Sequence, residues 1–258
     1  MILDVHFHPF EEAMDQDTAA VMARARDVGV IAAVAAGLDV ATNDRVLTLS
    51  RDIPGIAPAV GFHPWFLNHA PDLAALERQA ADPRVVAIGE IGLDGKHETP
   101  MEVQERWFRD QMALASNFGL PVIVHARSAV ARVEAILGEF PDVCGVLHSF
   151  PGGPDIARRL IDRGFYVSFS GSVTRPRAKG AHRLARALPL DGILVETDAP
   201  AIGMDGVPAE EVEPRHVTRV AAALAALREV DVREIEAATF DNTCQVFGPR
   251  LDPYLGAA

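Results

Sequence analysis

Residues 103–125, VQERWFRDQMALASNFGLPVIVH, contain the two kinds of element from which most of the chain is built. Gly119 and Pro121 are expected to end a helix, and residues 122–125 form a short apolar run that ends in a histidine. Such a run predicts a strand buried on both faces. The helix itself is predicted from apolar residues at helical spacing, namely Val103, Trp107, Phe108, Met112, Ala115 and Phe118.

Seven further apolar runs alternate with helix-like segments on either side of this stretch. Eight βα units in about 250 residues are typical of a TIM barrel. We therefore predict an α/β fold, the (β/α)8 barrel, in a single domain over residues 1–258. A doubly wound open sheet is the alternative, but no glycine-rich dinucleotide fingerprint follows the first run. The eight predicted strands are residues 2–8, 30–37, 56–63, 85–90, 122–125, 143–148, 165–170 and 193–198.

The composition is that of a globular protein, with 49% hydrophobic and 23% charged residues, which excludes disordered and fibrous classes. The net charge of −12 argues against a basic nucleic-acid or membrane-binding face. It leaves a phosphate-bearing substrate open, because bound metal ions reverse the local field. Two cysteines make no disulfide framework, and neither a signal peptide nor an apolar run of membrane-spanning length is recognisable. We expect a cytoplasmic protein with no membrane partner; the oligomeric state stays open.

Polar side chains stand at the ends of the predicted strands. His6 and His8 end the first strand, and residues i and i+2 of a strand share a face, so both imidazoles are expected to point the same way. In a barrel the carboxyl ends of all strands converge on one mouth, where active sites are built. The other polar residues at predicted strand ends are His63, Glu90, His125, His148 and Asp198.

A single histidine at a strand end is more often a structural residue than a ligand. Here five of the nine histidines lie at such ends, and burying each without a partner would cost roughly 1–3 kcal/mol. Metal ions are the common partners of such a set. Mixed imidazole and carboxylate ligands favour zinc, manganese or iron over calcium, and magnesium stays open.

These motifs resemble those of the TatD-type metal-dependent hydrolases, the TatD-related DNases. They occur in the order that this family shows, and weaker similarity continues to residue 248, so the resemblance covers nearly the whole chain. The matching motifs are DVHFH (4–8), GFHPW (61–65), GEIGLD (89–94), PVIVHAR (121–127), HSF (148–150) and VETDAP (195–200).

The resemblance implies an amidohydrolase-like barrel that holds two divalent metal ions per chain. Such ions lower the pKa of water toward neutrality and offset charge that develops in the transition state. Asp198 and Glu90 are the expected catalytic carboxylates, with Asp198 orienting the water or taking its proton. The implied ligands are His6, His8 and Asp198 for one ion, His125 and His148 for the other, and Glu90 as the bridge between them.

Candidate substrate contacts surround this implied site. His63 is similar to a family histidine that lies near the substrate phosphate or near an additional metal. Arg127 follows His125 closely, and Ser149 follows His148. For Arg127 a phosphate contact and a solvated loop position are equally good interpretations. Arg175 follows the seventh strand, where barrels often bind phosphate, although a solvated position is common there.

Glu196 shares a strand face with Asp198 and is expected to orient a ligand imidazole. Three positions depart from the family pattern. Gly95 replaces a frequent aromatic residue, Ser128 a usual aspartate and Val212 a usual asparagine. None of the three is an implied metal ligand, so these departures concern the substrate.

The leading functional hypothesis is a metal-dependent phosphodiesterase, a deoxyribonuclease that acts on DNA ends. The acidic charge favours a single-stranded end or a small phosphoester, and we expect no stable binding of duplex DNA. The first alternative is an amide or lactone hydrolase. Many related barrels of that kind bridge their metals with a modified lysine, but Lys96 and Lys179 are not at predicted strand ends. The second alternative is a catalytically idle metal-binding or scaffold protein, which would not need a complete ligand set.

Overall fold

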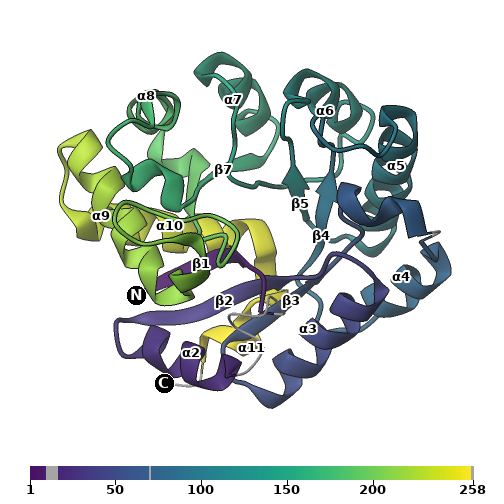
Figure 1. Ribbon diagram of the computed structural model, residues 1–258, viewed down its shortest axis with the longest axis horizontal. Helices are drawn as coiled ribbons and strands as arrows, with labels where there is room; N and C mark the ends of the chain where they lie inside the picture. Colours follow the sequence, from purple (N-terminus) through teal and green to yellow (C-terminus); the bar gives the residue numbers. More distant parts are fainter. Residues whose placement is uncertain (10–16, 70, 257–258) are drawn as a thin grey trace.

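Eight parallel strands pair in chain order in the computed structural model, which describes residues 1–9, 17–69 and 71–256. The helices lie around the outside of this sheet (Figure 1). The predicted (β/α)8 architecture is confirmed. The strands are β1 (Ile2–Phe7), β2 (Val30–Ala36), β3 (Ile56–Val60), β4 (Ala87–Gly92), β5 (Val122–His125), β6 (Gly145–Leu147), β7 (Phe165–Phe169) and β8 (Ile193–Val195).

Hydrogen bonds beyond the end of β8 bring the last strand against the first. The Asp198 N–H donates to the His6 carbonyl oxygen at 3.0 Å, and the His8 N–H donates to the Ala199 carbonyl oxygen at 2.8 Å. These bonds join the two edges of the sheet at its carboxyl end. The backbone that closes the barrel therefore also carries three of the predicted site residues.

The helix predicted before β5 is confirmed as α5 (Met101–Phe118), with Phe108, Met112 and Ala115 fully buried. Gly119 ends it in the left-handed region at φ 60°. No helix in the described part of the chain is long and apolar enough to cross a membrane. The other helices are α2 (Thr18–Arg26), α3 (Val40–Asp52), α4 (Leu73–Ala80), α6 (Val130–Leu137), α7 (Pro154–Ile161), α8 (Lys179–Ala187), α9 (Val217–Arg228), α10 (Val232–Phe247) and α11 (Asp252–Leu255).

The C-terminal segment covers the amino ends of the strands. The Arg250 guanidinium donates to the Val85 carbonyl oxygen, and the Tyr254 hydroxyl donates to that of Arg84, just before β4. Apolar side chains of α10 and α11 pack against alternate strand residues, so the strands are buried on both faces. The carboxyl ends of the strands, where the active sites of such barrels are built, lie at the opposite end.

Several strands differ from their predicted bounds at the carboxyl end. β8 ends at Val195, and three residues later Asp198 has a left-handed backbone at φ 53°, which a strand does not contain. β3 ends at Val60, and the His63 N–H instead donates to the Leu38 carbonyl oxygen. β6 is limited to residues 145–147, and β4 runs from 87 to 92, so Glu90 lies inside a strand.

Candidate metal centre

Five imidazoles and two carboxylates meet at the carboxyl end of the barrel. They come from strands on all sides of the mouth, and six of the seven side chains are buried, while the seventh, His125, is mostly buried. Their donor atoms form three overlapping groups in which all atoms lie within 4.8 Å of one another. These residues are His6 and His8 from β1, His63 after β3, Glu90 in β4, His125 at the end of β5, His148 after β6 and Asp198 after β8.

Glu90 lies at the centre and divides the imidazoles into two sets. Its Oε2 is 3.3 Å from His6 Nε2 and 3.4 Å from His8 Nε2. Its Oε1 is 2.8 Å from His125 Nδ1 and 3.6 Å from His148 Nε2. Each carboxylate oxygen thus faces a different pair of potential ligands, which is the geometry of a carboxylate that can bridge two ions.

Asp198 spans the same two sets from the opposite edge of the barrel. Its Oδ1 is 3.7 Å from His6 Nε2 and 3.5 Å from His8 Nε2, and its Oδ2 is 3.6 Å from His148 Nε2. The left-handed backbone at Asp198 lets the chain leave β8 while this carboxylate still faces the cluster. Aspartate tolerates that conformation better than most residues.

The outer nitrogens of two imidazoles have oxygen partners. His8 Nδ1 is 3.1 Å from the Ala36 carbonyl oxygen, and His148 Nδ1 is 2.8 Å from Glu196 Oε1. The His8 contact is a hydrogen bond and the His148 contact an ion pair, and in a neutral ring either oxygen favours the hydrogen on Nδ1 and leaves the Nε2 lone pair toward the cluster. Both rings are therefore oriented for metal binding, and the expected orienting role of Glu196 agrees with this geometry.

Asp94 supports His125 in a similar way, although the sequence motif containing it indicated no role. Its Oδ2 lies 3.4 Å from His125 Nε2 and accepts a hydrogen bond from the Trp65 indole at 2.6 Å. Burial alone would raise the pKa of Asp94, but the bonds from His125 and Trp65 outweigh it and hold the pKa below its ordinary value. His125 also hydrogen-bonds through Nδ1 to Glu90 Oε1 at 2.8 Å, and although burial would lower its pKa, the bonds to Asp94 and Glu90 raise it.

His63 has the opposite hydrogen arrangement. Its Nδ1 accepts the Trp65 backbone N–H at 3.2 Å, and its Nε2 lies 3.4 Å from Glu90 Oε1. A neutral ring that accepts at Nδ1 carries its hydrogen on Nε2. A neutral His63 therefore presents a hydrogen-bond donor to the cluster, where His8 and His148 would present lone pairs only in their neutral forms.

The carboxylates of the cluster are held in their ionised form. Burial alone would raise the pKa of Glu90, but the surrounding imidazoles, led by His63 and His148, hold it well below its ordinary value. Burial opposes ionisation of Asp198 as well, and contacts with His148 and His8 lower its pKa. Two buried anions this close together need positive charge between or beside them.

The pKa values of the imidazoles in the cluster shift in opposite directions. Burial alone would lower the pKa of His8 and of His148, but Asp198 beside the first and Glu196 beside the second raise each pKa to about 10. For His63 burial prevails and lowers the pKa to about 4. Protons on His8 and His148 thus balance the carboxylates, a balance that divalent cations can supply instead. The nitrogen and oxygen donors present fit such cations.

A cavity of about 340 Å³, here called the inner cavity, opens above the cluster between Trp65, Ser149, Asp198 and Ile202. It contains two of the predicted substrate contacts. Ser149 lines it and hydrogen-bonds to Ser170 at 2.8 Å. The Arg127 side chain also lines it, is 57% exposed and lies 3.7 Å from Asp94.

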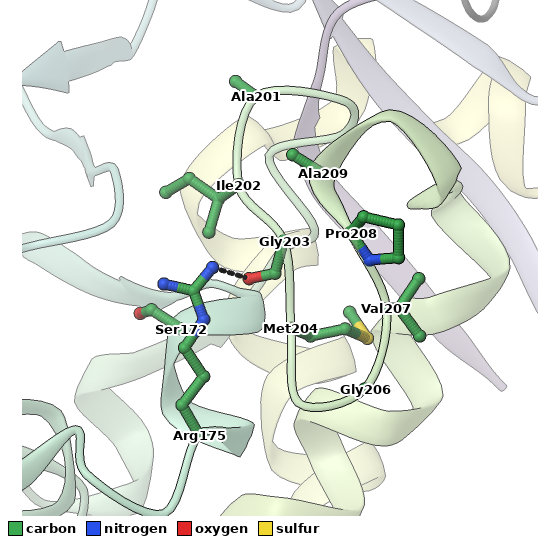
Figure 2. A pocket seen from close by; sticks show the side chains of 10 residues that line it. All are labelled: Ser172, Arg175, Ala201, Ile202, Gly203, Met204, Gly206, Val207, Pro208 and Ala209. Carbon is green, nitrogen blue, oxygen red and sulfur yellow. Dashed lines mark hydrogen bonds between the residues drawn. The ribbon is translucent and has the colours of Figure 1, made fainter.

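Arg175 does not line the inner cavity. It lies in a neighbouring pocket between residues 171–175 and residues 201–209, here called the outer pocket, where it donates to the Gly203 carbonyl oxygen at 2.6 Å (Figure 2).

Two departures from the family pattern lie in contact. The Gly95 N–H donates to the Arg127 carbonyl oxygen, and a Cβ at Gly95 would lie 2.7 Å from the Ser128 carbonyl oxygen. Ser128 has φ 55°, which is why α6 begins at Val130 and not at Ser128. Residues 95 and 128 therefore form one local arrangement at the rim. Val212 is buried and lies apart from it in sequence.

The family model of the TatD related DNases matches residues 3–248. The chain belongs to the TatD-related DNase family. It is 35% identical over 252 residues to the uncharacterized metal-dependent hydrolase YabD of Bacillus subtilis, covering 96% of this chain and 99% of YabD. It is 34% identical over 266 residues to the 3′-5′ ssDNA/RNA exonuclease TatD of Cronobacter turicensis, covering 98% and 100% of the two chains.

A solved structure of a second TatD family member has the same fold. The crystal structure of the TatD homologue YjjV from Escherichia coli superposes with a TM-score of 0.90 at 31% identity, covering 95% of this chain and 97% of YjjV. The predicted barrel, the predicted family and the predicted class of metal-dependent hydrolase are confirmed by these matches. The ligand set rests on the geometry described above.

Proposed function

We propose that this TatD family protein is a phosphodiesterase that removes nucleotides from the 3′ end of single-stranded DNA with two divalent metal ions. The observation that carries the proposal is Glu90, whose two oxygens face two separate sets of imidazoles within 3.6 Å. The substrate class is supported by the Cronobacter turicensis relative, which is named as an exonuclease of single strands.

The proposed ligands are the two carboxylates and four of the five imidazoles of the cluster, without His63. Bound there, divalent ions would lower the pKa of water and offset the charge on phosphate oxygens. The Asp198 carboxylate, ionised and directed into the inner cavity, would accept a proton from the attacking water. The ligands would be His6, His8 and Asp198 for one ion, His125 and His148 for the other, and Glu90 for both.

Groups around the cluster would bind the substrate phosphate. His63 presents an Nε2 hydrogen, Arg127 a guanidinium at the rim and Ser149 a hydroxyl, and all three can donate to phosphate oxygens. Trp65 and Ile202 supply the apolar part of the inner cavity wall, which accommodates a sugar or a base. The chain's own residues thus orient the phosphate while Asp198 accepts the proton.

The inner cavity is small and the molecule as a whole is acidic. A volume of about 340 Å³ is at the lower end of small-molecule sites. The net charge of −12 repels DNA from the rest of the surface. We therefore propose a small footprint of about one to three phosphate contacts and no stable binding of long duplexes.

The proposed function is tested with a panel of substrates. Metal-loaded protein is incubated with a labelled single strand, a closed circular duplex, a lactone and an amide, each with and without a chelator. We expect mononucleotides to be released from the single strand only, and the chelator to abolish the release. Turnover of the lactone or the amide without turnover of DNA would contradict the proposal and favour the first alternative.

His63 provides a specific prediction, because its hydrogen faces inward. His63→Ala is expected to lower kcat/KM for a phosphodiester by roughly 10- to 100-fold, the loss of one hydrogen bond to a charged group. The metal content should stay close to that of the wild type. Elemental analysis and steady-state kinetics measure both quantities.

The matched control is His125→Ala, which removes a proposed ligand whose Nδ1 lies 2.8 Å from Glu90 Oε1. That variant should lose bound metal as well as activity. An equal loss of metal in both variants would make His63 a ligand and contradict the hydrogen arrangement described here.

A further inference from the structure

The inner cavity and the outer pocket share a wall. The outer pocket has a volume of about 620 Å³ and lies between the 3-10 turn after β7 (Gly171–Thr174) and the loop 201–209 after β8. Ala201 and Ile202 line both spaces. A chain that extends from the inner cavity past Ile202 therefore enters the outer pocket.

The outer pocket combines an apolar wall with one cationic group. Met204, Val207 and Pro208 stand along the loop on one side, and the Arg175 guanidinium lies on the other between Ile202 and Ser172 (Figure 2). One N–H of Arg175 donates to Gly203, which holds the guanidinium in place. A guanidinium has five N–H donors, so this anchor leaves donors available to bind a phosphate bidentately.

A row of hydroxyls connects the two spaces. Ser149 lines the inner cavity and hydrogen-bonds to the buried Ser170 at 2.8 Å. Ser170 hydrogen-bonds in turn to Ser172 at 3.1 Å, and Ser172 lines the outer pocket. A polar strip beside an apolar wall is complementary to a nucleotide chain, which has a polar backbone and flat, largely apolar bases.

We propose that the outer pocket is a second nucleotide subsite. The terminal nucleotide occupies the inner cavity, and the next nucleotide passes over Ile202. Its base lies against Val207 and Pro208, and its outer phosphate binds Arg175. This inference rests on the proposed function. It adds a substrate preference: the enzyme selects strands over compounds with a single nucleotide.

The test compares substrates that reach one or both spaces. Thymidine 5′-(p-nitrophenyl phosphate) has no second sugar and no outer phosphate and cannot reach Arg175, whereas thymidine strands of two to five nucleotides extend into the outer pocket. For the wild type we expect kcat/KM to rise with length up to three nucleotides. Arg175→Ala should lower kcat/KM for three or more nucleotides by about tenfold more than for the single-nucleotide substrate. Arg175→Lys should recover part of this loss, because lysine keeps the charge without the bidentate geometry.

Arg177→Ala is the matched control, since Arg177 is exposed on the same segment and does not line the outer pocket. A second measurement is the binding of a labelled five-nucleotide strand, monitored by anisotropy across a salt series. Each protein in this measurement also carries Asp198→Asn. Arg175→Ala should reduce the salt slope by about one phosphate contact, and Arg177→Ala should leave it unchanged.

Two results would overturn the subsite. One is an equal loss of kcat/KM on all substrates in Arg175→Ala, and the other is an equal effect of Arg175→Ala and Arg177→Ala. Failure of the metal-loaded wild type to hydrolyse any of these phosphodiesters is a different result. It would contradict the proposed function itself, and the subsite with it.

Discussion

Asp198→Asn is expected to lower kcat for phosphodiester hydrolysis by about 10²–10⁴-fold while most of the bound metal stays in place. Asparagine has the same size and keeps one oxygen that can bind a cation, but its amide is not a base. In the structure the two Asp198 oxygens face His8 at 3.5 Å and His148 at 3.6 Å, so the carboxylate is held at both of its ends. The loss should therefore come from proton transfer and not from a displaced side chain.

Single-turnover kinetics and elemental analysis of the same preparation separate these two effects. The matched control is Asp205→Asn, the same substitution at an exposed residue of the same loop, which should leave kcat unchanged. Near wild-type turnover of Asp198→Asn with full metal content would remove Asp198 from the mechanism.

Glu90→Ala is expected to remove both metal ions and all measurable hydrolysis. One carboxylate faces both sets of imidazoles, so its loss weakens two sites at once. The stoichiometry of bound divalent ions should fall from about two per chain in the wild type toward zero. The substitution also removes the negative charge of Glu90, which faces the buried imidazoles of the cluster. Binding of divalent cations among these imidazoles therefore becomes less favourable.

Thermal unfolding provides a measurement of metal binding that does not depend on activity. A ligand that binds only the folded state stabilises it by about 2.7 kcal/mol at 100 times its Kd. Excess metal should therefore raise the Tm of the wild type and leave that of Glu90→Ala unchanged. Glu98→Ala, at an exposed glutamate, is the control for the loss of one charge. An unchanged stoichiometry in Glu90→Ala would contradict the bridging role.

Much of the site could be predicted from strand order alone. Residues 122–125 are predicted as a strand and observed as β5 with the same bounds, because an apolar run after Gly119 and Pro121 has few other ways to be buried. Parallel strands place their carboxyl ends at one edge, so His125 and His148 had to meet once both strands were recognised. The same argument brings His6, His8 and Glu90 to that edge.

Contacts between segments distant in sequence could not be predicted. Asp4 accepts hydrogen bonds from the backbone and the hydroxyl of Thr197, 193 residues away, and so ties β1 to the end of β8. Asp94 interacts with Trp65 and His125, and Arg175 is anchored by Gly203 in a separate pocket. None of these pairs has a signal in local periodicity, because the two partners of each pair are far apart in sequence.

The residue pattern by itself determined the barrel and the residues that gather at its mouth, because burial of apolar runs and the common direction of parallel strands leave few other arrangements. Only the tertiary structure decided what each imidazole does there. In their neutral forms His8 and His148 offer a lone pair at Nε2 whereas His63 offers a hydrogen, and this difference arises from the partner of the other ring nitrogen. For His8 that partner is a carbonyl oxygen of β2, for His148 the Glu196 carboxylate just after β8, and for His63 a backbone N–H group.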